Sequence, residues 1–268
     1  PDPIVKQDDY FIIRHTGGTT GPSKGVAYTH KTWLDAGRDW FFAFPPVQKG
    51  DVCQHAGPIS HGSGYFFTPI WLCGGVNLLV KTFEPSEVVA TMEREQVAYG
   101  FLVPTMLNAI AREETATSRD WSHLKVLQVG GSPIADDTAL LAHRVFGDVL
   151  FQGYGQTEAV PITMMGPTEW FSTVEGSNPL RSAGRPLPFG DLAILHPETQ
   201  QELAIGEEGE IAIRCDGQML GFWDNNAATA ERMHDGWVLS GDIGKLDSNG
   251  YLYVLDRKDD MIISGGFN

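Results

Sequence analysis

A short segment near the beginning of the chain, from Thr16 to Gly25, brings together glycines, hydroxyl side chains and one lysine. Glycines allow backbone N–H groups to close around an anion, and threonine hydroxyls add hydrogen-bond donors. Lys24 contributes a positive charge at the same place. In chemical terms the segment predicts a cradle for a polyphosphate. Taken alone, a surface turn rich in small residues would have the same composition.

Two familiar nucleotide-binding patterns do not fit this segment. The P-loop of kinases and GTPases places its lysine directly after a glycine and directly before a serine or threonine. In this chain Lys24 follows Ser23 and precedes Gly25. The dinucleotide fold of oxidoreductases is also disfavoured, because no G-x-G-x-x-G follows a predicted strand with an acidic residue about twenty positions further on.

The elements that must position this loop alternate between strands and helices. Four short apolar runs favour strands: 11–13, 76–80, 124–129 and 149–151. Glycine loops are expected after the last two runs. Three stretches favour helices: 30–42, 85–96 and 136–146. Gly147 suits the C-cap of the third helix. This alternation predicts an α/β fold with a mainly parallel sheet flanked by helices.

From about residue 182 onward the pattern changes to short apolar runs separated by turns. Turn signals include Asp216-Gly217, Asp235-Gly236 and Asn249-Gly250. Helical periodicity is nearly absent there apart from 227–233. This pattern predicts a smaller antiparallel β subdomain. We therefore expect an α/β part over residues 1–181 and a β-rich subdomain over 182–255.

The composition suits a chain with a sizeable core, and the charge limits its partners. Of the 268 residues 42% are hydrophobic, and the formal net charge is -15. A surface of that sign repels nucleic-acid phosphates and anionic lipids, so neither is expected as a general partner. A bound polyphosphate would need locally placed donors and a cation. No apolar run approaches the roughly 18 residues of a membrane span.

The cysteines give an indication of the cellular compartment. Cys53, Cys73 and Cys215 are far apart, odd in number and without metal-ligand spacing. Free thiols in a reducing cytoplasm are the simplest interpretation, so a cytoplasmic location is expected. Nothing in the sequence indicates the oligomeric state.

The loop and several later segments resemble, in the same order along the chain, the motifs of the AMP-forming synthetases. This superfamily includes acyl-CoA synthetases, aryl-CoA ligases, peptide-synthetase adenylation domains and beetle luciferases. The matching segments are Thr16 to Gly25, Gly130 to Pro133, Gly153 to Glu158, Ser182 to Pro186, Gly209 to Trp223, Trp237 to Asp242 and Asp256 to Ile263. The family usually has proline directly before the lysine, where this chain has Ser23, and threonine where it has Ser240.

The resemblance implies a reaction in two halves. A carboxylate attacks the α-phosphate of ATP, which gives an acyl-adenylate and pyrophosphate, and coenzyme A thiolate then displaces AMP. The expected cofactors and co-substrates are therefore ATP or AMP, Mg2+ and coenzyme A, together with a small-molecule carboxylic acid. Catalysis of the first half depends on neutralising and positioning two anions.

The same resemblance assigns roles to individual residues. Thr157 would contact the α-phosphate, and Glu158 would hold Mg2+, for which a hard carboxylate oxygen is suited. The β- and γ-phosphates would be held by Thr16, Gly18, Thr19, Thr20, Gly21 and Lys24. Adenine and ribose would be held by Gly130, Gly131, Ser132, Tyr154, Gly155, Asp242 and Arg257. A tyrosine offers a flat face for adenine, and an aspartate can accept two hydrogen bonds from the ribose diol.

Further expectations concern the acid and the domain arrangement. His61 would act as a gate beside the carboxylate tunnel, with the aromatic run 65–67 near an apolar acyl pocket; a structural core histidine is the alternative. Asp259 marks a hinge within 256–268. The small domain, with the lysine that the family uses for adenylation, would lie beyond Asn268, and part of the large domain before Pro1. The chain is thus expected to be a fragment that is not fully active alone.

Three hypotheses about function remain open at this point. An acyl-CoA synthetase for a fatty or other apolar acid is favoured, because residues 52–68 contain no acidic side chain. An amino-acid-activating adenylation domain would need such an acid to pair with the substrate ammonium. A non-catalytic nucleotide-binding module is the alternative from a different class.

Overall fold

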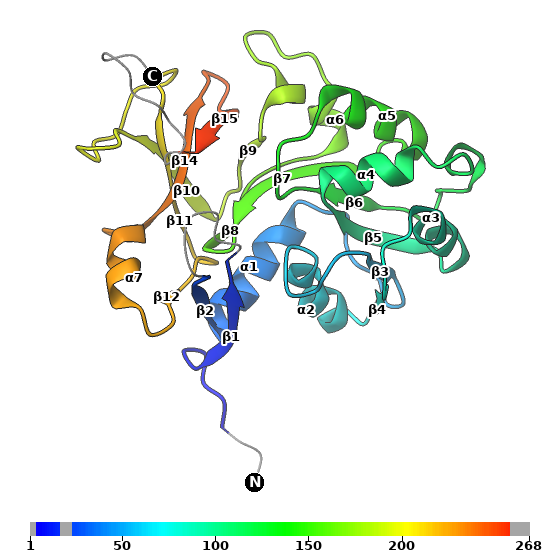
Figure 1. Ribbon diagram of the computed structural model, residues 1–268, viewed down its shortest axis with the longest axis horizontal. Helices are drawn as coiled ribbons and strands as arrows, with labels where there is room; N and C mark the ends of the chain where they lie inside the picture. Colours follow the sequence, from blue (N-terminus) through cyan, green and yellow to red (C-terminus); the bar gives the residue numbers. More distant parts are fainter. Residues whose placement is uncertain (1–3, 17–22, 258–268) are drawn as a thin grey trace.

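The computed structural model describes residues 4–16 and 23–257, and within them the strands form three sheets (Figure 1). The largest sheet has seven strands, the second has five and the third has three. No helix in the described ranges combines the length and the apolar character needed to cross a membrane. The arrangement confirms the predicted α/β fold with an antiparallel β sheet after it.

The seven-stranded sheet is mainly parallel. Its strands are β3 (Val52–His55), β4 (Val76–Leu79), β5 (Val97–Leu102), β6 (Val126–Val129), β7 (Leu150–Gln156), β8 (Ala159–Met165) and β9 (Arg185–Pro186). They lie in the order β4-β3-β5-β6-β7-β8-β9. Strands β3 to β7 pair in parallel, whereas β8 and β9 are antiparallel. All six residues of β5 are buried, as expected for a central strand covered on both faces.

Helices cover both faces of this sheet (Figure 1). They are α1 (His30–Phe42), α2 (Gly64–Leu72), α3 (Pro85–Arg94), α4 (Pro104–Ala111), α5 (Asp136–Phe146) and α6 (Pro167–Trp170), with 3-10 helices at Ala116–Ser118 and Pro179–Arg181. Successive residues of a strand point to opposite faces. Leu127 and Val129 of β6 therefore pack with α3, α4 and α5, whereas Val126 packs with α1 and α2.

The five-stranded sheet is antiparallel throughout. It contains β10 (Gly190–Leu195), β11 (Gly209–Cys215), β13 (Met233–His234), β14 (Trp237–Leu246) and β15 (Leu252–Arg257), and α7 (Asn226–Arg232) precedes β13. His234 pairs with Trp237, so Asp235 and Gly236 form a two-residue hairpin loop. Both loop residues have positive φ, at 48° and 84°, which is the geometry that an Asp-Gly turn favours.

The third sheet supports the two ends of the predicted phosphate loop. It consists of β1 (Tyr10–His15), β2 (Gly25–Thr29) and β12 (Gly221–Phe222). The N–H of Thr16 donates to the carbonyl of Lys24 at 3.0 Å, which closes the hairpin just below the loop. Strand β12 pairs with β2, and β9 pairs with β8. Both β9 and β12 lie after residue 182, yet they pair with strands that lie before it. The division of the chain at residue 182 therefore stays a prediction.

One local prediction about the large sheet is wrong. A glycine loop after 149–151 is not found, because β7 continues through Gln156, where β8 pairs back along it. Tyr154 and Gly155 therefore lie in a strand. Elements without a predicted counterpart include β3, β5, β8, α2 and α4. Their segments are short, largely apolar runs, which periodicity alone cannot assign to helix or strand.

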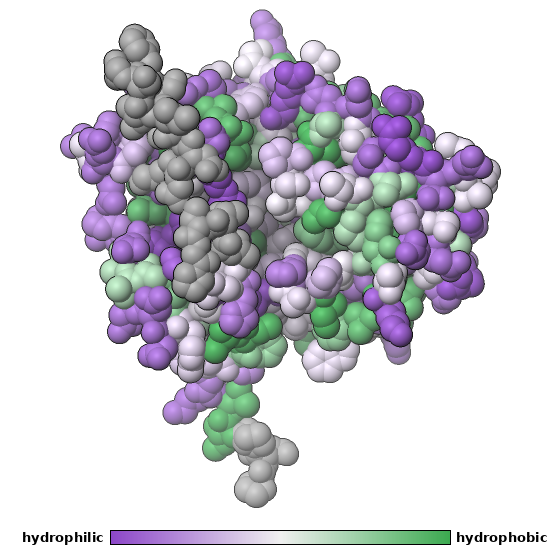
Figure 2. Space-filling model, in the orientation of Figure 1, coloured by the Kyte–Doolittle hydropathy of each residue, from purple (hydrophilic) through white to green (hydrophobic). Residues whose placement is uncertain are grey.

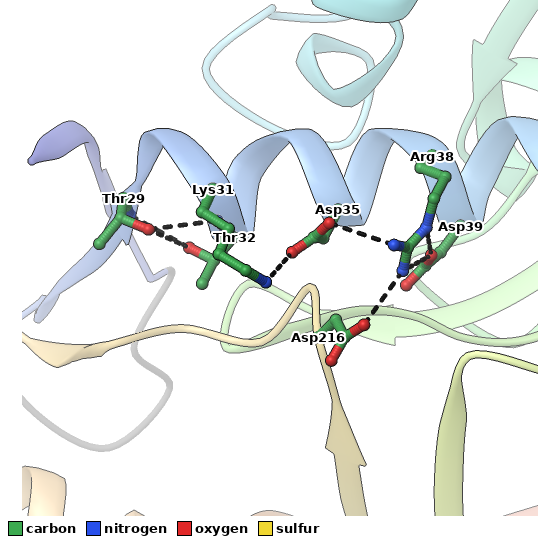
Figure 3. A network of polar contacts seen from close by, with 7 residues as sticks. All are labelled: Thr29, Lys31, Thr32, Asp35, Arg38, Asp39 and Asp216. Atoms are coloured by element: carbon green, nitrogen blue, oxygen red, sulfur yellow. Dashed lines mark hydrogen bonds and ion pairs between the residues drawn. The ribbon is translucent and has the colours of Figure 1, made fainter. Parts of the chain in front are cut away.

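Polar contacts tie helix α1 to its surroundings (Figure 3). The N–H of Thr32 donates to Thr29 Oγ1 and the N–H of Thr29 donates to Thr32 Oγ1, both at 3.1 Å, which is a capping box. Further along, the Arg38 guanidinium lies 2.6 Å from Asp39 and 3.4 Å from Asp216. Helix α1 is thereby joined to the segment that leads into β12.

Replacing the capping residue should loosen α1. In the Thr29→Ala variant the first turn loses a hydrogen-bond acceptor, so we expect the free energy of unfolding to fall by about 1 kcal/mol. Denaturant unfolding followed by circular dichroism measures this. Thr173→Ala is the matched control, because Thr173 is exposed and should change stability by less than about 0.5 kcal/mol. Equal stability of both variants would contradict the capping role.

Candidate active site

A cavity of about 690 Å3 opens at the carboxyl ends of the parallel strands. Its walls come from β1, β5, β6, β7 and β8 on one side and from α7, β14 and β15 on the other. In the space-filling view the surface recedes between these two parts (Figure 2). The carboxyl edge of an open parallel sheet is where ligands of α/β proteins generally bind.

Most of the predicted site residues border this cavity. They are Thr16, Lys24, His61, Gly130, Gly131, Tyr154, Gly155, Thr157, Glu158 and Arg257. Segments far apart in the sequence thus converge on one space, although the roles of these residues stay predictions. Five further predicted residues lie outside the described residues: Gly18, Thr19, Thr20, Gly21 and Asp259.

Two predicted nucleotide contacts do not line the cavity. Ser132 is exposed at the surface, one residue beyond Gly131. Asp242 is only 4% exposed and meets the cavity through Tyr154 and Arg257, which do line it. The prediction placed both Ser132 and Asp242 in direct contact with the nucleotide, and the cavity wall does not include either of them.

Asp242 is instead the centre of a hydrogen-bond network between two sheets. Its Oδ2 accepts from the Tyr154 hydroxyl at 2.6 Å and from Gln156 Nε2 at 2.7 Å, both on β7. Its Oδ1 lies 2.9 Å from Arg257 Nε. Burial, followed by the neighbouring Asp242 charge, raises the pKa of Tyr154 well above its ordinary value. Tyr154 is therefore a neutral donor, and Asp242 is held by donors from both β7 and β15.

The turn that carries Thr157 and Glu158 is held from two sides. The Tyr28 hydroxyl donates to the Thr157 carbonyl at 2.7 Å, and the N–H of Met219 donates to the Glu158 carbonyl at 2.8 Å. Tyr28 lies on β2 and Met219 just before β12. The third sheet therefore fixes this turn in the cavity wall while its side chains remain available.

Glu158 is buried and faces a cation. It is 5% exposed, and its Oε1 lies 3.6 Å from Arg232 Nη2. Mg2+ is commonly held by one or two protein carboxylates together with substrate phosphates. A single buried carboxylate on the wall of a cavity fits that mode of binding. No cluster of three or more metal-binding side chains occurs in residues 4–16 and 23–257.

The cavity carries the opposite charge from the protein as a whole. Within the described ranges its lining contains Arg14, Lys24, Arg232 and Arg257 but only Glu158 as a carboxylate. The complete chain has a net charge of -15. Clefts with walls of one sign concentrate ligands of the other sign. The site thus supplies the local cations that a polyphosphate would require in an acidic protein.

The segment that carries His61 is anchored by Arg14, which the sequence analysis did not single out. Arg14 is 5% exposed, and its Nη2 donates to the His61 carbonyl. Its guanidinium lies 4.3 Å from the ring centre of Tyr65 and 5.2 Å from that of Trp33. Gly64 completes the turn, because an added Cβ would lie 1.8 Å from the Ile59 carbonyl oxygen. The backbone at His61 is therefore fixed, whereas its side chain is exposed.

A second histidine, His55, supports the same segment from within the core. Asn77 Nδ2 donates to the Phe67 carbonyl at 3.1 Å, so Asn77 Oδ1 faces His55 Nε2 at 2.7 Å. Nε2 must then carry the proton, and Nδ1 accepts from the Ser63 hydroxyl at 2.7 Å. Burial lowers the pKa of His55, although its hydrogen bonds to Asn77 and Ser63 oppose this shift. The neutral ring therefore holds Ser63, which lines the cavity.

The lowered pKa of His55 should make stability depend on pH. As the pH falls through the ordinary histidine pKa of about 6.5, the unfolded chain binds a proton that the folded protein resists. The free energy of unfolding should therefore decrease between about pH 7.5 and pH 5.5, and His55→Gln should remove this part of the decrease. Denaturant unfolding at a series of pH values measures it. His123→Gln, at an exposed position, should keep the wild-type dependence. If His55→Gln also kept it, the assignment to His55 would be wrong.

Part of the cavity lining is mainly apolar. This part includes Trp40, Tyr65, Phe101, Val103, Met106 and Val160, with Gln128 among them. Of the aromatic run predicted to lie near an acyl pocket, only Tyr65 borders the cavity. Phe66 is fully buried in the core, and Phe67 lies 37% exposed beside His55. A strand or helix position gives no sign of which apolar residue faces a cavity, so Trp40, Phe101 and Gln128 could not be singled out in advance.

The comparisons with known proteins agree with this geometry. Residues 1–223 match the model of the AMP-binding enzyme family. The chain therefore belongs to the AMP-binding enzyme family.

Curated relatives align with the entire chain. A feruloyl-CoA synthase of Amycolatopsis is 36% identical over 274 residues, which cover 100% of this chain and 53% of that protein. The medium/long-chain-fatty-acid–CoA ligase FadD8 of Mycobacterium tuberculosis is 34% identical over 279 residues, which cover 100% of this chain and 47% of that protein. The chain thus spans about half the length of these relatives.

Solved structures share the fold. The o-succinylbenzoate-CoA synthetase MenE of Bacillus subtilis, in complex with its acyl-adenylate intermediate, has a TM-score of 0.88 and 29% identity, covering 98% of this chain and 52% of that one. The amide bond synthetase McbA of Marinactinospora thermotolerans has a TM-score of 0.85 and 27% identity, covering 97% of this chain and 51% of that one.

Proposed function

We propose that the protein to which this chain belongs activates a carboxylic acid with ATP and transfers the acyl group to coenzyme A. The observation that carries the proposal is the single cavity that joins a cationic, hydroxyl-bearing end to an apolar, aromatic end. The first half of such a reaction brings a carboxylate onto a phosphate, so two anions must be held together. Fixed cations on the cavity wall meet this need without reorganisation during the reaction.

In this proposal the cationic end of the cavity holds the nucleotide. Lys24 and Thr16, together with residues 17–22, bind the β- and γ-phosphates, and Thr157 binds the α-phosphate. Tyr154 and the glycines at 130–131 lie along the nucleoside. Glu158 would hold Mg2+, which when bound neutralises phosphate charge. Arg257 and Asp242, which form an ion pair, lie at the ribose end. Arg257 would leave this ion pair to bind the nucleotide.

The apolar end holds the acid in this proposal. His61, on a backbone fixed by Arg14, borders the passage between the two ends and would gate the carboxylate. The charge of this end argues against an amino acid as substrate. Among the described lining residues Glu158 is the only carboxylate, and Arg14 is a buried cation that would oppose an ammonium group. The relatives named as feruloyl-CoA synthase and fatty-acid–CoA ligase give further support for a CoA ligase.

Two parts of the proposal concern residues beyond this chain or outside its described part. Rotation at Asp259 would move a small domain that carries the adenylating lysine, so the present chain would bind ligands better than it turns them over. A cytoplasmic place of action belongs to the same proposal. The nucleotide-binding half can therefore be examined on this chain, and turnover only on the full-length protein.

The proposal predicts acid-dependent chemistry that needs Glu158. The full-length protein should exchange pyrophosphate into ATP only when a suitable carboxylic acid is present. Glu158→Gln removes the metal-binding charge but keeps the shape of the side chain, so we expect exchange to fall on the order of a hundredfold. Glu175→Gln is the matched control, because Glu175 is exposed and lines no part of the cavity.

The same assay separates the alternatives. Exchange driven only by amino acids would reject the CoA-ligase proposal in favour of an amino-acid-activating domain. Calorimetric titration of ATP into the present chain tests the nucleotide half alone. Binding that depends on Glu158, together with no exchange by the full-length protein, would identify a non-catalytic nucleotide-binding module.

A further inference from the structure

A polar side chain is buried in the aromatic end of the cavity. Gln128 is 1% exposed and lies on β6 between Leu127 and Val129. Its side chain points to the opposite face from theirs, into the layer that otherwise contains Val126, Trp40 and Phe101. Gln128 also borders the cavity. Buried amides are nearly always hydrogen-bonded, so the partners of this one decide its role.

Trp40 fixes the orientation of the Gln128 amide. An indole N–H can only donate, and Trp40 Nε1 donates to Gln128 Oε1. The amide oxygen therefore faces Trp40, and the NH2 group faces away from it. In the described part of the chain, no hydrogen-bond acceptor is found for Gln128 Nε2. The cavity thus presents two N–H donors of one buried amide without a protein acceptor.

The backbone opposite makes room for this NH2 group. Gly153 on β7 lines the cavity, and a Cβ added there would lie 2.3 Å from Gln128 Nε2. Any other residue at position 153 would displace the amide. The close approach of strand β7 therefore keeps Gln128 in its place on the cavity wall, where both residues line the space.

Flat aromatic rings surround the amide. Trp40 stacks on Tyr65 with ring centres 5.1 Å apart and an interplanar angle of 18°. Trp40 meets Phe101 edge to face at 6.3 Å and 72°. All three rings border the cavity. Such walls suit a planar ring, which packs against aromatic faces with specific geometry.

We infer that the acid substrate is a ring acid, aromatic or otherwise flat, with an oxygen acceptor away from its carboxylate, and that Gln128 Nε2 binds this oxygen. The inference rests on the proposed function and deepens it by naming the substrate class. A plain alkyl chain would leave the buried NH2 group without an acceptor, and a site of this kind discriminates strongly against a substrate that lacks the group. The expectation of a wholly apolar acid is thereby replaced by one with a polar end.

The test compares acids that differ by one oxygen. With the full-length protein, kcat/KM for thioester formation is measured for 4-methoxycinnamate, 4-hydroxycinnamate and 3-methoxycinnamate, each against cinnamate, and for octanoate. We expect at least one oxygenated acid to be preferred over cinnamate by roughly ten- to a hundredfold. In Gln128→Met, which keeps the length but removes the donors, this ratio should fall to within about threefold of one.

Two further variants make the outcome decisive. Gln128→Leu removes both the donors and the acceptor of Trp40, so the ratio should fall at least as far. Gln201→Met, at an exposed position, should keep the wild-type ratio. A wild-type ratio near one for every pair, or a preference that survives both changes at Gln128, would overturn the inference while leaving the proposed function intact. No thioester from any acid would instead count against the proposed function.

Discussion

The carboxylate of Asp242 is the contact on which the arrangement of the site depends. It stands on β14 of the antiparallel sheet and accepts hydrogen bonds from Tyr154 and Gln156 on β7 of the mainly parallel sheet. Because Asp242 is buried, losing Tyr154 or Gln156 would leave its carboxylate short of a hydrogen-bond donor, which costs about 1–3 kcal/mol. This network fixes the position of one cavity wall relative to the other. The Gln156 contact to the Ser240 carbonyl at 2.8 Å and the apolar packing of β8 against β11 and β14 hold the same two sheets together.

Charge is a second constraint, because the net negative charge of the chain opposes the binding of an anion such as ATP. A chain with a net charge of -15 would repel ATP, yet basic side chains from β1, the phosphate loop, α7 and β15 gather on one cavity. Arg14 and Arg232 reach it from segments that bear no resemblance to a phosphate-binding motif. Arg14 is stabilised by two aromatic faces instead of a carboxylate, so its charge is not cancelled within the described residues. In a partly desolvated cleft, nearby cations attract an anion more strongly than distant, salt-screened surface carboxylates repel it.

The nucleotide end of the site could be predicted from the sequence far better than the acid end, and the reason is geometric. Residues such as Thr157 and Glu158 are neighbours in the chain, so a short motif records them together. The acid end takes Trp40 from α1, Phe101 from β5 and Gln128 from β6, each in a pattern that serves equally well for core packing. The fold class followed from alternating periods, but the length of β7 did not, because its second half is stabilised by β8, a partner that local pattern does not reveal. The sequence assigned Asp242 to the ribose, which stays a prediction, and it did not show that Tyr154 and Gln156 would also contact this carboxylate.

Strands β6 and β7 each contribute residues to both proposed ends of the cavity. On β7, Gly153 lies against Gln128, while the hydroxyl of Tyr154, one residue later, donates to Asp242. On β6, Gln128 is followed within two residues by Gly130 at the same cavity. Residues of a strand are spaced by about 3.3 Å and cannot slide independently, because both neighbours are hydrogen-bonded. In the proposed reaction, an acid held by Gln128 would therefore have its carboxylate placed relative to the phosphates of ATP through rigid backbone. Reaction rates are sensitive to displacements of about 1 Å, so an acid that misses this contact would lose rate as well as affinity.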